Sequence, residues 1–153
     1  MYDLYHLMKF VHVGASIAWI GGGIVLLMLV QRVRADGNAA EMSALLGRIE
    51  ALGKAFFAPM SVVVLVAGIV MAAIGGLFAA PWVSAGFLGI FVSAGIGMGY
   101  LTPTSGKLRA LIDQHGMNHP EVGRLGAQMM LVSRIDTGIL MLIVAAMVFK
   151  PGA

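Results

Sequence analysis

Cysteine is missing from this 153-residue chain, and charged residues are scarce. The lack of cysteine excludes disulfide bonds, thiolate metal sites, iron–sulfur clusters and cysteine nucleophiles. Charged residues make up 11% of the chain, whereas hydrophobic residues make up 59%. This composition argues against a soluble globular domain and is typical of a membrane protein.

What the chain does contain is a set of long apolar runs, each near the roughly 20 residues that a helix needs to cross a bilayer. They cover about residues 4–30, 56–78, 82–101 and 129–149. Little sequence remains outside them, so residues 1–153 are predicted to form a single integral membrane domain. We expect an all-α fold, a four-transmembrane-helix bundle surrounded by the lipid bilayer.

Basic residues gather in the two long connections between these runs, at Arg32, Arg34, Arg48, Lys54, Lys107, Arg109 and Arg124. The short connection at 79–81 carries no charge. Because basic loops are retained in the cytoplasm, both long connections are predicted to be cytoplasmic and both termini to lie outside. Topology thus explains the basic residues, and no nucleic-acid partner is expected.

The long connections are themselves predicted to be helical. Asn38 is placed to cap a helix with Glu41 in its first turn. Apolar residues then recur at three- and four-residue spacing, at Met42, Leu45, Leu46, Ile49 and Leu52, and again at Leu108, Leu111 and Ile112. Such stripes indicate amphipathic cytoplasmic linker helices suited to a membrane interface.

His12 is the main candidate for chemistry, because an ionisable side chain inside a membrane span is costly and usually has a task. Neutral imidazole is a common ligand of haem iron and of other metals. Met8, Trp19 and Gly23 share its helical face, which would suit the edge of a bound haem. The alternative is a histidine that is hydrogen-bonded to a neighbouring helix, and the sequence leaves both interpretations open.

Arg134 and Asp136 form a second polar feature within the last apolar run. Arg134 can extend its side chain toward the cytoplasmic headgroups, whereas Asp136 is too short to do so. Residues two apart point to different sides of a helix, so the two are poor partners for each other. We expect Asp136 to face the bundle and pair with a group on another helix, as a structural contact or as part of a proton relay.

Two further patterns bear on metals and on assembly. The chain has 12 methionines, but only Met129 and Met130 are adjacent, so the indication of a Cu(I) site is weak. Small residues recur every four positions along the spans, which lets membrane helices pack closely. Together with the small size of the chain, these stripes favour a homo-oligomer.

Several short motifs carry a family resemblance. They are Lys9–His12 followed by Trp19, Ala58–Met60 followed by Gly68, the pair at 81–82, and the closing segment at 147–151. With them the chain resembles an uncharacterised family of small bacterial four-helix predicted integral membrane proteins. It also resembles HemJ-type protoporphyrinogen oxidases and copper-resistance D-type membrane proteins.

The HemJ resemblance implies haem b, with His12 as an axial ligand, in a protein of the bacterial inner membrane. It also implies a lysine early in the third helix, where this chain has Gly86, and an Asn-Glu pair where Ser133–Asp136 stand. We therefore expect a haem-b-binding redox protein that transfers electrons or oxidises a porphyrin or quinol, with its enzymatic activity uncertain. A copper-binding or copper-transport protein and a cofactor-free structural or assembly subunit are the alternatives.

Overall fold

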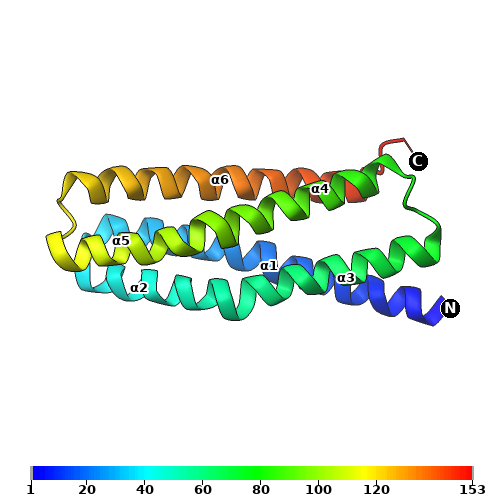
Figure 1. Cartoon of the computed structure of the whole chain (residues 1–153), viewed down its shortest axis with the longest axis horizontal. Coiled ribbons are helices and arrows are strands. Elements are labelled where there is room, and N and C mark those ends of the chain that lie inside the picture. Colours follow the sequence, from blue (N-terminus) through cyan, green and yellow to red (C-terminus); the bar gives the residue numbers. More distant parts are fainter. Residues whose placement is uncertain (1, 153) are drawn as a thin grey trace.

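The computed structural model describes residues 2–152 and contains helices throughout, joined by short connections (Figure 1). The four long rods are α1, then α2 with α3, then α4 with α5, and finally α6. In order the elements are α1 (Tyr2–Asp36), α2 (Ala39–Leu52), η1 (Gly53–Phe57), α3 (Ala58–Gly75), α4 (Pro81–Ile96), η2 (Gly97–Leu101), α5 (Thr102–His115) and α6 (Pro120–Phe149). The all-α prediction is confirmed.

The expected linker helices are α2 and α5, and each continues an adjacent span. A π-helical turn, η1 or η2, joins α2 to α3 and α4 to α5. Pro59 and Pro103 each follow the first glycine of such a turn by six residues. Because proline lacks an N–H and its ring crowds the preceding turn, a local π-helical adjustment lets the helix pass through it unbroken.

Each rod is longer than a bilayer is thick. The helix from Ala39 to Gly75 has 37 residues, or about 55 Å at about 1.5 Å per residue. The hydrocarbon core needs only about 30 Å. All four rods are long and apolar enough to cross a membrane. We call the end with the connections at 37–38 and 116–119 the charged end, and the end with the connection at 76–80 the opposite end.

Local sequence signals set the helix ends. The Asn38 side chain accepts a hydrogen bond from the backbone N–H of Glu41 at 3.2 Å, as predicted. The second span ends at Gly75, before the expected residue 78, because Gly76 adopts a left-handed conformation with φ 63°. Near the C-terminus, the ammonium of Lys150 lies 5.4 Å from the centre of the Trp82 ring, which holds the end of α6 against the start of α4.

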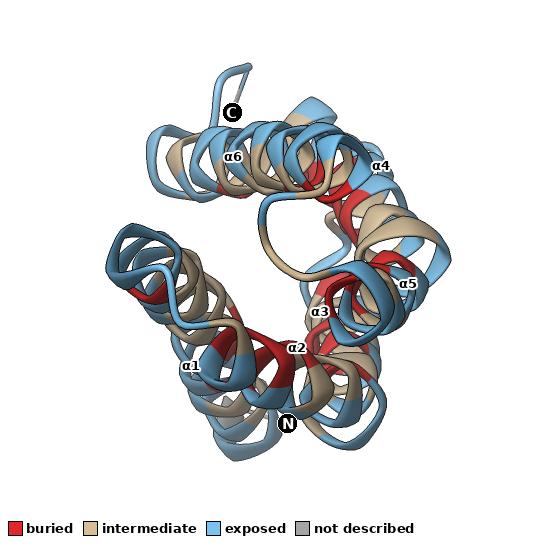
Figure 2. Ribbon diagram, turned by 90° about the vertical axis from the view of Figure 1, so that its left-hand side faces the viewer, coloured by how far each residue is buried: buried red, intermediate tan, exposed pale blue. Residues whose placement is uncertain are grey.

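Viewed end-on, the rods surround a central region, and the buried residues lie mainly on the inner sides of the rods (Figure 2). The closest pairs are α1 with α3, α2 with α5, and α4 with α6. Large apolar side chains cover the outside, among them Phe10, Ile17, Leu88 and Leu142. An outer surface of this kind is stable in lipid and would aggregate in water, so the protein is a multi-pass integral membrane protein.

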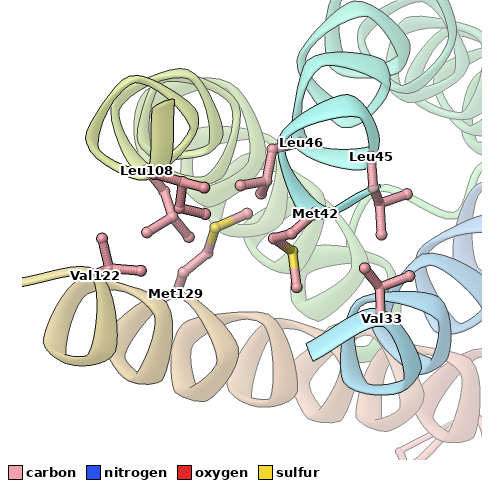
Figure 3. Close-up of a cluster of buried hydrophobic side chains, with 8 residues drawn as sticks. Val33, Met42, Leu45, Leu46, Leu108, Val122 and Met129 are labelled. Atoms are coloured by element: carbon pink, nitrogen blue, oxygen red, sulfur yellow. The ribbon is translucent and has the colours of Figure 1, made fainter. Parts of the chain in front are cut away.

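A compact apolar cluster holds the charged end together (Figure 3). Val33 of α1, Leu46 of α2, Leu108 of α5 and Met129 of α6 meet there, and Leu46 is fully buried. The stripe predicted on α2 therefore packs against the other rods. Polar contacts supplement the cluster, since the Ser43 hydroxyl of α2 donates to a carboxylate oxygen of Asp113 on α5 at 2.6 Å.

Candidate functional site

His12 lies half-buried on α1 and faces α3. Its Nδ1 is 2.9 Å from the backbone carbonyl oxygen of Val64. Gly68, one turn further along α3, makes this approach possible. A Cβ atom at position 68 would lie 3.3 Å from the His12 Cε1 and 3.4 Å from the Nδ1. The imidazole thus occupies the space that a side chain would otherwise fill.

The contact with Val64 sets the tautomer of His12. A carbonyl oxygen only accepts hydrogen bonds, so the proton of the neutral ring is on Nδ1, which donates it. The Nε2 is then the nitrogen with the lone pair. Metal-bound histidines are commonly held in this way, with the second ring N–H donated to a backbone carbonyl. The same hydrogen bond is also what we expect of a purely structural histidine that is bonded to a neighbouring helix, so it supports both interpretations of His12.

The residues expected to surround a haem beside His12 are spread along α1. Met8 is half-buried one turn earlier. Trp19 lies seven residues further on and Gly23 eleven, which correspond to about 10 Å and about 16 Å along the helix. Trp19 is buried in a cluster with Val64 and Leu140 at the middle of the bundle. The structure thus separates His12 and Met8 from Trp19 and Gly23.

Trp19 and Gly23 line a cavity of about 200 Å³ that occupies the half of the bundle toward the charged end. We call this region the charged half. The cavity reaches from Trp19 and Leu140 at mid-bundle to Met117 near the charged end, and every rod contributes to its wall. His12 and Met8 are not among its lining residues. Both π-helical turns line it, and such turns often occur at functional sites.

Methionines make up a notable part of this wall. Five of them line the cavity, namely Met42, Met98, Met117, Met129 and Met130. Figure 3 shows Met42 of α2 and Met129 of α6 pointing into the space between the rods. Little in the sequence indicates this gathering, because apart from the adjacent Met129 and Met130 the methionines come from different parts of the chain and form no spaced motif. Flexible, polarisable thioethers suit a site that adapts to the shape of its ligand.

Asp136 and Ser93 provide the polar groups at the inner part of the cavity. Ser93, on α4, is only 2% exposed, and its hydroxyl has no hydrogen-bond partner. The Oδ1 of Asp136, on α6, is likewise buried without a partner, although Ser93 is its polar neighbour. Arg134 is exposed on α6 and does not line the cavity. Asp136 therefore faces the bundle, and its polar neighbour on another helix is Ser93 of α4, while its Oδ1 has no hydrogen-bond partner.

Gly86, where the HemJ resemblance implies a lysine, is used for helix packing. A Cβ atom there would collide with the Cε of Met147 on α6. Gly89, three residues later, meets Ile143 on α6 in the same way. These glycines let α4 and α6 approach closely, and a side chain at position 86 would require the end of the Met147 side chain to move.

Over residues 2–152, no group of three or more His, Asp or Glu side chains is placed to hold a metal. His115 and His119 stack with ring centres 4.6 Å apart near the charged end. The Nδ1 of His119 accepts a hydrogen bond from the backbone N–H of Glu121, so this histidine caps α6.

Comparison with known proteins identifies the family to which the chain belongs. Neither the curated proteins nor the solved structures include a match to this chain. A family model matches residues 6–151, which is nearly the whole length and includes His12, Trp19, Ser93 and Asp136. The chain belongs to the family described as predicted integral membrane protein (DUF2269).

Proposed function

We propose that this protein binds haem b and has a redox role in the bacterial inner membrane. The observation that carries the proposal is the hydrogen bond from the His12 Nδ1 to the Val64 carbonyl, which leaves the Nε2 as a ligand nitrogen. Haem iron already has four porphyrin nitrogens, so a single protein histidine is enough to hold it. When bound, haem would supply one-electron chemistry, and His12 would fix its position and influence its potential.

Within this proposal, electron exchange with a quinone is favoured over porphyrin oxidation. The lysine that the oxidase resemblance implies is absent, and the Gly86 position is filled by Met147. A membrane electron carrier needs no such residue, only a cofactor held close to lipid-soluble partners. Porphyrin oxidation remains the second form of the proposal.

The test is an absorption spectrum of the protein purified in detergent from haem-supplemented cells, oxidised and then reduced with dithionite. His12→Gln is the informative variant, because its amide can still donate to the Val64 carbonyl but binds iron poorly. We expect a Soret band and reduced b-type peaks in the parent protein, retained in His115→Ala and lost in His12→Gln. A parent protein without these bands, or equal bands in His12→Gln, would contradict the proposal.

Copper binding is the second candidate, and the methionine wall of the cavity is the observation that favours it. Thioethers are soft ligands suited to Cu(I). A competition assay with a Cu(I) chelator would measure the affinity of the parent protein and of Met129→Leu. Met28→Leu, at an exposed position on α1, is the matched control. Equal affinities in both variants would exclude the cavity as a copper site. A cofactor-free subunit is the remaining alternative if both metal assays fail.

The proposed topology places the charged end in the cytoplasm and the termini on the periplasmic side. The lack of cysteine makes this easy to test, because single cysteines can be introduced without background. We expect a membrane-impermeant maleimide to label Pro151→Cys in spheroplasts and to label Ala40→Cys only after lysis. The reverse pattern would invert the topology. A homo-oligomer is also proposed, and cross-linking of the same variants would measure it.

A further inference from the structure

We propose that the cavity of the charged half binds a lipophilic organic cation, with its positive group between Asp136, Ser93 and Trp19. This proposal is independent of haem, because His12 does not line the cavity. It rests on three features of the wall: unpartnered polar atoms, an aromatic ring at mid-bundle, and open space lined with apolar side chains.

Two buried polar atoms of the cavity wall have no hydrogen-bond partner. A buried polar atom without a partner costs stability, so proteins rarely keep one unless a ligand or water completes it. Ser93 and Asp136 leave two such atoms next to each other in one wall. The Ser93 hydroxyl can turn its hydrogen toward the carboxylate, but it supplies no charge to offset it. Asp136 takes part in none of the ion pairs among the described residues. Its carboxylate therefore has no cation of the protein to neutralise it.

The surroundings of these atoms favour a positive group over a neutral one. Asp136 precedes Leu140 by one turn on the same face of α6, and Leu140 packs in one cluster with Trp19. Trp19 and Asp136 line the same inner part of the cavity, and the face of an indole attracts cations. Arg34 is the one cationic residue in the wall. It lies near the charged end, roughly 20 Å from Asp136 along the bundle.

The remaining wall fits the apolar body of such a ligand. Met42, Met98, Met129 and Met130 provide flexible thioether surface. Gly97 leaves open space, since a Cβ atom built there has no neighbour within 4 Å. Gly23 and Gly123 of the same wall are equally open. A cavity of about 200 Å³ is well above the volume that a single water needs, so it has room for an organic group.

Tetraphenylphosphonium is a suitable probe, because tetraphenylborate has nearly the same shape and the opposite charge. Binding of both ions to the full-length protein in uncharged detergent would be measured by equilibrium dialysis, with empty micelles subtracted. The chain has two tryptophans, so a Trp82→Phe background makes Trp19 the fluorescent reporter. We expect saturable binding of the cation with quenching of Trp19, and binding of the anion at least about tenfold weaker.

Variants then locate the site. Asp136→Asn keeps the shape of the side chain and removes its charge, and should weaken cation binding at least about tenfold. Asp36→Asn, at an exposed position in the last turn of α1, is the charge-matched control and should bind as the parent does. His12→Gln should also bind as the parent does, which separates this proposal from the haem proposal.

Gly97→Leu covers the case in which Asp136→Asn does not fold. It fills open space in the wall and replaces a glycine in a right-handed helical conformation, so we expect weaker binding without loss of stability. Equal binding of the two ions, or unchanged cation binding in Asp136→Asn and Gly97→Leu, would overturn the proposal. Preferential binding of a neutral quinol that the cation does not displace would also overturn it.

Discussion

Two glycines at helix contacts toward the opposite end differ from two glycines in the wall of the cavity. Toward the opposite end, glycines are filled by their neighbours: Gly68 receives the His12 ring, and Gly89 receives the side chain of Ile143. In the charged half, Gly23 and Gly97 border open space, with no atom within 4 Å of an added Cβ. The first two glycines therefore allow close helix packing, whereas the second two leave part of the cavity wall open.

Two pairs of polar residues also differ between these regions. The Ser16 hydroxyl donates to the backbone carbonyl of His12 at 2.7 Å, and His12 in turn donates to Val64. Ser93 and Asp136, which border the cavity, have side-chain atoms without partners. Complete hydrogen bonding indicates a region that is stable by itself, and incomplete hydrogen bonding indicates one that a ligand completes. On this basis we propose haem ligation by His12 in the first region and cation binding in the second.

The largest expected effect on stability comes from replacing one glycine of each kind with leucine. Gly89→Leu forces a side chain into Ile143 and should lower the free energy of unfolding by about 1–3 kcal/mol. Gly97→Leu meets open space and should leave it unchanged or raise it by up to about 1 kcal/mol. Thermal unfolding in detergent, followed by circular dichroism, measures both. Similar losses in the two variants would remove the distinction between the halves.

The next largest loss of stability is expected when a polar contact of the charged half is removed. Ser43→Ala removes the hydrogen bond from α2 to Asp113 on α5 and should cost about 1 kcal/mol. Asp113→Asn keeps an acceptor oxygen and should cost less. The same unfolding assay applies. If Ser43→Ala had no effect, the apolar cluster alone would account for the pairing of α2 with α5.

A smaller effect on stability is expected at two serines, one in each half of the bundle. Ser16→Ala loses a satisfied hydrogen bond and should cost about 0.5–1 kcal/mol. Ser93→Ala removes a buried hydroxyl that has no partner, so the stability of the ligand-free protein should stay the same or rise slightly. A clear loss of stability in Ser93→Ala would show that water or another group satisfies the hydroxyl in the absence of a ligand.

The smallest effect concerns the exposed ion pairs at the charged end. Arg32 and Asp36 are 3.3 Å apart, with largely exposed side chains. Asp36→Asn should change the free energy of unfolding by less than about 0.5 kcal/mol. A larger change would mean that surface charge contributes to the stability of the charged end, and the salt dependence of unfolding would then have to be measured.

Much of this architecture could be predicted from local patterns. The apolar runs predicted the spans, and Asn38 predicted the start of α2. Gly76 stands where the second span ends. The continuity of α2 with α3 was not predicted, because a proline normally marks a helix boundary. The glycine six residues before Pro59 and again before Pro103 is the signal that could have indicated a π-helical turn at each place.

By itself the sequence determined the membrane setting, the number of rods and the polar residues inside them, because hydropathy and helical period are local properties. Only the tertiary structure decided that the Nδ1 of His12 faces the Val64 carbonyl, and that Trp19 and Asp136 share a cavity without His12. The physical reason is that a lone polar residue or methionine takes its role from what other helices bring near it. That depends on how closely the glycines let the rods approach one another.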